Sequence, residues 1–231
     1  MNAFSSVIVF FVDDVERVRR ALPHLPIFPL PGAVLLPHSL VPLHIFEPRY
    51  QKMTHDCSEG LRVLALANIP DEIAAAETPP RVLPVIGVGV LARVDKLPDG
   101  RFNIVLRGAG RARIVEELAS GEPYRLVRAE LLEWRTAPGA DEEELGDALK
   151  NLVLALSSAE RTAETQVLAQ LSARAQDPAE LADVVAGVLL SSPTERQAVL
   201  EALEPAQRLE IVLRAAASAL AQTAPRAAAP N

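Results

Sequence analysis

The residues that break helices are concentrated in the first 140 positions of this 231-residue chain. That part holds 14 of the 19 prolines, 9 of the 11 glycines and all nine aromatic residues. The remaining residues, 141–231, are rich in Ala, Leu and Glu, which favour helices. Aromatic and β-branched residues favour strands, so the distribution predicts a strand-rich part followed by a helical part. We expect the junction at 136–140, where Pro138 and Gly139 precede an acidic helix start.

The strand-rich part begins with seven prolines within residues 23–48. Proline lacks a backbone donor, so this stretch is predicted to be extended chain and short edge strands. Pro48 suits the first turn of a helix that ends near Cys57, and residues 71–80 are expected to form a loop. The remaining apolar runs, separated by turns, predict strands of a partly closed barrel at 62–68, 85–96, 102–106, 111–115 and 124–134.

The helical part carries apolar residues at helical spacing and three Asp-, Ser- or Glu-Pro pairs that are typical helix starts. These pairs predict helices that begin at 178, 193 and 205, after two earlier helices at 141–156 and 165–175. The predicted organisation is an N-terminal extension at 1–23, a β-rich subdomain at 24–136, a helical subdomain at 141–222 and a flexible tail at 223–231.

The net charge of −7 belongs entirely to residues 141–231, because residues 1–140 carry 16 acidic and 16 basic side chains. The acidic side chains are interpreted as lying on solvated helix faces and largely near helix starts, where the helix dipole favours negative charge. A neutral strand-rich part argues against nucleic-acid binding, and Arg111 and Arg113 are interpreted as part of a solvated strand face. The most apolar run near the N-terminus, residues 7–12, is too short for a signal peptide or a membrane span. We therefore expect a cytoplasmic protein that does not bind membranes.

Searches for catalytic motifs give negative results. No lysine follows a glycine, as a phosphate-binding loop requires. Residues 87–92 match the loose dinucleotide pattern G-x-G-x-x-A, but no helix is expected after them, so they are interpreted as a strand. No serine lies in a G-x-S-x-G motif, and the single cysteine, Cys57, is interpreted as a small buried hydrophobic residue.

The four histidines lack the close spacing of a metal site; they are His24, His38, His44 and His55. The sequence therefore predicts no catalytic residue, no metal, no cofactor and no enzymatic activity.

The most distinctive segment joins a proline-rich apolar run, residues 25–32, to the sequence Pro-Leu-His-Ile-Phe-Glu-Pro-Arg-Tyr at residues 42–50. Tyr50 and Met53 share a helix face that is expected to pack on the sheet. Glu47 and Arg49 are placed to pair with each other. On physical grounds alone, these residues are structural.

The same segment resembles the N-terminal, substrate-binding domain of Lon-type ATP-dependent proteases. Supporting matches lie at residues 86–88, 99–101, 108–114, 181–183, 196–201 and 208–210. The resemblance implies an α+β fold, with a PUA-like β pseudobarrel followed by a helical bundle. It also implies a non-catalytic recognition domain that binds unfolded polypeptide or a protein partner. The candidate binding residues are Phe46, Glu47, Arg49 and Tyr50.

Two alternative functions remain at this point. PUA-like barrels resemble RNA-binding domains, so an RNA or small-molecule binding module is one alternative, although the neutral charge of residues 1–140 argues against RNA. An independent peptidase is the other, although no nucleophile motif supports it.

Overall fold

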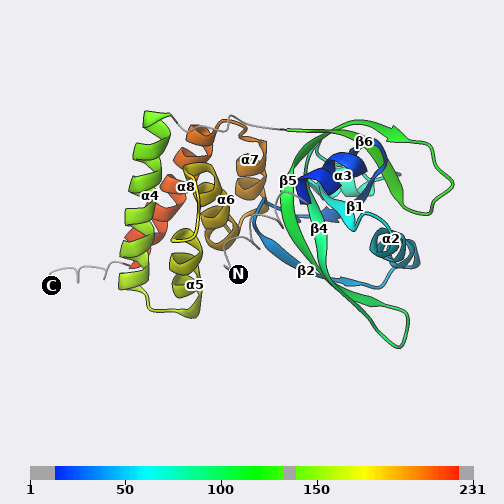
Figure 1. Ribbon diagram of the computed structural model, residues 1–231, viewed down its shortest axis with the longest axis horizontal. Coiled ribbons are helices and arrows are strands. Elements are labelled where there is room, and N and C mark those ends of the chain that lie inside the picture. The colour runs from blue at the N-terminus through cyan, green and yellow to red at the C-terminus, as the bar shows by residue number, and fades with distance from the viewer. Residues whose placement is uncertain (1–13, 133–138, 224–231) are drawn as a thin grey trace, which may run out of the picture. The chain divides into compact units, whose positions relative to one another are not determined.

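The computed structural model describes residues 14–132 and 139–223. The chain divides into two compact units, residues 1–133 and 134–231, of which the first carries the strands and the second is helical (Figure 1). The α+β class is therefore confirmed. The predictions for residues 7–12, for 136–138 and for the tail from 224 onward fall outside the described residues.

The first unit opens with a helix over residues 14–21 and contains six strands. Its further elements are η1 (Leu22–His24), β1 (Leu25–Pro31), β2 (Leu40–Ile45), α2 (Pro48–Glu59), β3 (Val63–Ile69), α3 (Glu72–Ala76), β4 (Val85–Lys96), β5 (Phe102–Leu118) and β6 (Arg125–Leu131).

Five of the strands close into a ring, and β2 is attached outside it. The strand order is β2-β5-β4-β3-β1-β6, and β6 pairs again with β5. The predicted partly closed barrel is thus confirmed. The two strands predicted between residues 102 and 115 are one 17-residue strand, β5, with a bulge at Ala109. Its first half pairs with β2 and its second half with β6, so this strand links the ring to the added strand.

The prediction that prolines confine residues 23–48 to edge strands is wrong for β1, which lies between β3 and β6. The two pairings are staggered, because β6 pairs with residues 25–27 and β3 with residues 27–31. Each proline of β1 therefore lies where only one neighbouring strand is paired, as at a strand edge, where proline is tolerated.

The core of the ring unit has two parts, separated by β3, whose seven residues are all buried. Alternate residues of a strand point to opposite faces. Val63, Ala65 and Ala67 pack with the helix over 14–21, while Leu64 and Leu66 pack on the other side with α2.

Residues 33–38, which we call the crossing loop, run from β1 to β2 over two glycines. A Cβ atom at Gly87 would lie 1.9 Å from the carbonyl oxygen of Leu35, and one at Gly108 would lie 2.0 Å from that of Leu36. Only glycine permits this backbone approach. The G-x-G-x-x-A match at 87–92 lies within β4, as its interpretation as a strand predicted.

Two local predictions in this unit are wrong. The predicted loop at 71–80 contains the short helix α3, whose N-terminus is capped by Asp71. Arg111, expected on a solvated face, is fully buried, whereas Arg113 is exposed. Arg111 pairs with Gly87 across the sheet, and the crossing loop covers that face.

The second unit contains five described helices. They are α4 (Ala140–Ala159), α5 (Ala163–Ser172), α6 (Pro178–Leu189), α7 (Pro193–Glu201) and α8 (Pro205–Thr223). The predicted caps are confirmed at α6 and α7, where Asp177 and Ser192 accept hydrogen bonds from the backbone N–H groups of Glu180 (2.7 Å) and Glu195 (3.4 Å). Acidic residues occupy the first turns of α4, α5, α6 and α7, in line with the interpretation of the negative charge.

A buried ion pair joins α6 to α8. Arg208 donates to Asp183 over 2.9 Å, and both side chains are fully excluded from solvent. A buried charge that loses its partner costs far more than the intact pair contributes. The pair therefore fixes how these two helices meet.

We predict that Gly108→Ala destabilises the chain by about 3 kcal/mol, because the new methyl group would overlap the backbone of the crossing loop. Gly121→Ala is the matched control, since nothing lies within 4 Å of its Cβ position. Urea unfolding of both variants measures the difference. Equal stability of the two variants would show that the crossing loop is not held by Gly108.

We further predict that Asp183→Ala lowers the free energy of unfolding by about 3 kcal/mol, because it leaves Arg208 charged in an apolar interior. Lys150→Ala is the control, because the Lys150–Asp147 pair is exposed and contributes little. The measurement is urea unfolding followed by the far-ultraviolet helical signal. A loss no larger than that of the control would contradict the structural role of the buried pair.

Candidate functional site

The four candidate residues from the sequence lie together where β2 ends and α2 begins, but they do not form one surface. Phe46 projects outward with 62% of its surface exposed. Tyr50 is buried, with its ring centroid 4.3 Å from that of Phe28. Phe46 is therefore placed for contact with another molecule, and Tyr50 holds α2 on the sheet.

Glu47 and Arg49 form the ion pair expected from the sequence. Their closest atoms are 2.8 Å apart, and the Arg49 guanidinium also lies 4.5 Å from the centre of the Tyr50 ring. Burial raises the pKa of Tyr50 above its ordinary value. The two charges neutralise each other beside Phe46, so this corner presents an aromatic side chain without a net local charge.

The surface that the sequence analysis missed is the outer face of β2. Leu40, Pro42 and His44 are exposed, and they alternate with partly buried Val41 and Leu43. Together with Phe46, the three exposed residues form a line that we call the outer stripe. The alternation was present in the sequence, but five of the strand's six residues are apolar or proline, so period-two polarity could not be recognised.

A shallow cavity of about 380 Å³ lies on this face, lined by residues of β2, β4 and β5. His44 closes one side: its Nδ1 lies 2.8 Å from Oδ1 of Asn103, and its ring is stacked 6.2 Å from that of Phe46. The charged residues here occur as close pairs, Arg93 with Asp95 at 2.7 Å and Arg101 with Asp99 at 2.5 Å. The arginine and aspartate charges beside the outer stripe therefore cancel one another.

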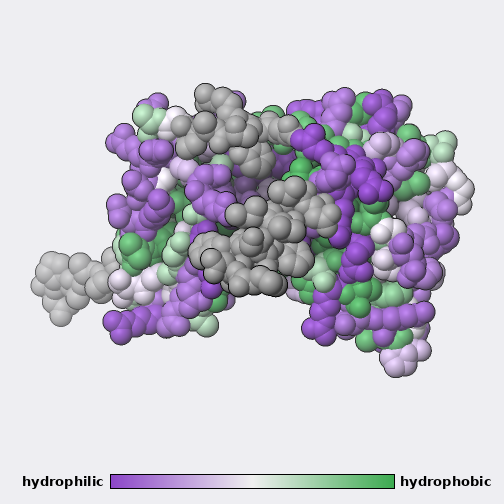
Figure 2. Space-filling model, viewed as in Figure 1, coloured by the Kyte–Doolittle hydropathy of each residue, from purple (hydrophilic) through white to green (hydrophobic). Residues whose placement is uncertain are grey.

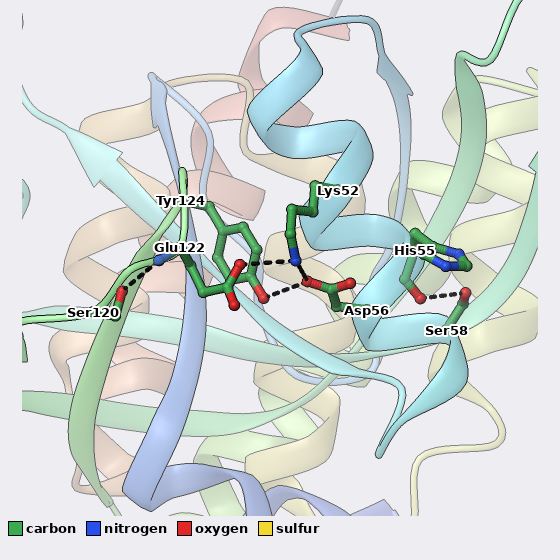
Figure 3. Close-up of polar contacts among 7 residues, drawn as sticks. All are labelled: Lys52, His55, Asp56, Ser58, Ser120, Glu122 and Tyr124. Carbon is green, nitrogen blue, oxygen red and sulfur yellow. Dashed lines mark hydrogen bonds and ion pairs between the residues drawn. The ribbon is translucent and has the colours of Figure 1, made fainter.

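A second cluster of polar residues joins α2 to the residues that precede β6 (Figure 3). Lys52 bridges the carboxylates of Asp56 (2.6 Å) and Glu122 (2.8 Å), and the Tyr124 hydroxyl donates to Asp56 over 2.8 Å. The backbone oxygen of His55 accepts a hydrogen bond from Ser58, and its ring lies away from the cluster in Figure 3.

The charges of this cluster serve to hold α2 to the residues that precede β6. Burial alone would raise the pKa of Asp56, but hydrogen bonds from Lys52 and Tyr124 bring it below its ordinary value. Hydrogen bonds to Asp56 and Glu122 raise the pKa of Lys52, which stays a cation. Each group already has a partner, so none is poised for proton transfer.

Cys57 lies beside this cluster and lines a cavity of about 300 Å³. Burial raises the pKa of its thiol to about 12. The reactive form of cysteine is the thiolate, and this environment suppresses it. The interpretation of Cys57 as a buried hydrophobic residue agrees with its 6% exposure.

Metal-binding and membrane-spanning features were sought over residues 14–132 and 139–223. No three His, Cys, Asp or Glu side chains gather there in a way that could hold a metal ion. None of the helices in this part of the chain combines the length and hydropathy that crossing a bilayer requires.

Comparison with known proteins identifies the relatives of this chain. The "Lon protease" of Azospirillum brasilense is 27% identical over 187 residues, and that of Trichlorobacter lovleyi is 28% identical over 186. These matches cover 81% and 80% of this chain but only 23% and 22% of the two relatives. The chain therefore spans about a quarter of the curated relatives that it matches.

Solved structures show the same fold. The N-terminal domain of Mycobacterium avium complex Lon protease matches with a TM-score of 0.67 at 19% identity, covering 84% of this chain and 98% of that domain. The Lon N-terminal domain protein from Xanthomonas campestris matches with a TM-score of 0.57 at 21% identity, covering 83% and 97%. The family model of the ATP-dependent protease La (LON) substrate-binding domain matches residues 24–217. This chain belongs to the family of the Lon substrate-binding domain.

Proposed function

We propose that this chain is a non-catalytic recognition module that binds exposed apolar segments of polypeptides through the outer stripe of Leu40, Pro42, His44 and Phe46. The observation that carries the proposal is the exposure of two large apolar side chains, one at the start of β2 and one directly after its end: Leu40 and Phe46 are each 62% exposed. Exposed apolar side chains that line up beside a groove are typical of protein contact sites.

The family supports this role, since its model describes a substrate-binding domain. Among the described residues, the polar groups around Cys57 and Lys52 are paired or buried and offer no activated nucleophile. Recognition without catalysis is therefore the function that the site supports best. In Figure 2, hydrophobic patches reach the surface of the strand-rich unit between hydrophilic ones, as expected of such a module.

The outer stripe favours polypeptide over nucleic acid. Arg93 and Arg101 beside it are paired with aspartates, and Arg125 and Arg128 on β6 pair with glutamates at 2.7 Å. Phosphate binding draws on unpaired basic side chains. No observation favours the RNA or small-molecule alternative for this surface.

We predict that Phe46→Ala weakens binding to reduced and carboxymethylated α-lactalbumin, a permanently unfolded protein, by about tenfold, because a large contact surface is lost. The measurement is fluorescence anisotropy of the labelled probe with the full chain. The variant should unfold at the same urea concentration as the unmodified chain, because Phe46 supports no core.

The control is Ile73→Ala, which removes an even more exposed hydrophobic side chain, 76% exposed, from α3. Its affinity should stay unchanged. Equal losses in both variants would indicate non-specific adhesion, and absence of binding by the unmodified chain would refute the proposed function.

A further inference from the structure

Within residues 14–132 and 139–223, the strand β2 has one unpaired edge. It pairs there with β5 alone, whereas each of the other five strands pairs with at least two others. The backbone N–H of Gly108 donates to the carbonyl of Ser39 (2.9 Å), so that carbonyl faces β5. The backbone polar groups of successive residues in a strand point to opposite sides. The backbone groups of Leu40, Pro42 and His44 therefore face away from β5.

The same assignment follows from the other side of β5. Leu97 of the β4–β5 turn donates to the carbonyl of Arg101, so the odd-numbered residues at the start of β5 face β4. Its even-numbered residues face β2, where Ile104 pairs with Leu43. Both observations therefore indicate that the backbone groups of Leu40, Pro42 and His44 point away from β5.

The free edge offers two N–H groups, from Leu40 and His44, and three carbonyl groups. Pro42 contributes a carbonyl only, because its nitrogen carries no hydrogen. Within residues 14–132 and 139–223, no hydrogen bond engages these outward groups. Donors and acceptors spaced two residues apart along a line match the backbone of one extended strand.

The side chains beside this edge determine what kind of strand fits. The outer stripe is mostly apolar, and the charges next to it cancel in the Arg93–Asp95 and Arg101–Asp99 pairs. A charged segment would gain no counter-ion here and would lose hydration. An uncharged, apolar segment complements the surface.

Pro42 disfavours a second copy of this chain as the occupant. An antiparallel pair of two β2 strands that aligns all three outward residues, with Leu40 of each opposite His44 of the other, would oppose one Pro42 to the other. That pair has two carbonyl groups and no donor, so it leaves both oxygens unsatisfied. A foreign strand with an N–H opposite Pro42 satisfies the carbonyl.

We propose that a partner polypeptide binds by adding to the free edge of β2 as an extended strand, with uncharged apolar side chains against the outer stripe. This inference rests on the proposed function and specifies its binding mode. Affinity then comes from main-chain hydrogen bonds to Leu40, Pro42 and His44, and selectivity comes from the side chains that reach the stripe.

The test compares two substitutions at one position in the full chain. His44→Pro and His44→Ala both remove the imidazole, but only His44→Pro removes the outward N–H. We expect His44→Pro to bind reduced and carboxymethylated α-lactalbumin about fivefold more weakly than His44→Ala, the effect of one net hydrogen bond. Leu40→Pro against Leu40→Ala repeats the comparison at the other donor, should circular dichroism show that one proline variant is unfolded.

The reverse substitution should strengthen binding. Pro42→Ala gives the free edge a third N–H without touching the bonds to β5, and we expect about fivefold tighter binding of the same probe. A side-chain-only binding mode predicts no gain, because alanine offers less apolar surface than proline.

The outcomes separate this inference from the proposed function. If the unmodified chain does not bind the probe, both are wrong. If it binds, but the proline and alanine variants at position 44 bind equally and Pro42→Ala brings no gain, only strand addition is wrong.

Two further outcomes would identify another occupant of the edge. Dimerisation that His44→Pro abolishes would assign the edge to a second copy. Binding that becomes at least tenfold tighter after Val9→Asp and Phe11→Asp would assign the edge to the chain's own residues 7–12; either result would overturn the proposal.

Discussion

The contact between the crossing loop and the two glycines beneath it is the constraint on which the strand-rich unit depends. The loop connects β1, which is one of the five ring strands, to β2, which is not. It passes directly over Gly87 and Gly108. A side chain at either position would lift the loop from the sheet. The hydrogen bonds of His38 and Ser39 to Gly108 would then be lost, and with them the start of β2. Because Gly87 and Gly108 have no side chain, the crossing loop can lie against the sheet and place β2, with its free edge, beside β5.

The candidate site depends on this placement of β2. Within residues 40–59, the strand β2 is exposed and the helix α2 that follows it is anchored in the core. Among the described residues, the attachment of β2 by one edge leaves its other edge unpaired and the outer stripe exposed. Immediately afterwards, Tyr50 and Met53 anchor α2 in the core, and the ion pair of Lys52 with Glu122 holds α2 to the residues that precede β6. Phe46 lies between the open strand and the anchored helix, so it stays exposed on a rigid support.

The sequence predicted the class and the helix starts because both depend on local chemistry. It failed where distant segments decide the outcome. Prolines in β1 were taken to exclude a central strand, but the staggered pairing of β3 and β6 accommodates them. Arg111 was assigned to solvent because nothing local shows that the crossing loop covers it. For the site, Phe46 and Tyr50 were found as one motif, but only the fold shows that one is exposed and the other buried.

Pro42 limits what can pair with the open edge of β2. An unpaired strand edge with apolar side chains invites other strands, including copies of the same chain, and proline is one of the residues that limit such pairing. Its position matters, because the missing N–H faces outward and costs the β2–β5 ladder nothing. The same omission removes one of three donors from the edge, so any strand that adds there is held by fewer hydrogen bonds. The proposed recognition role also requires release of the bound segment, and an edge that lacks a donor at its centre would favour reversible binding over permanent assembly.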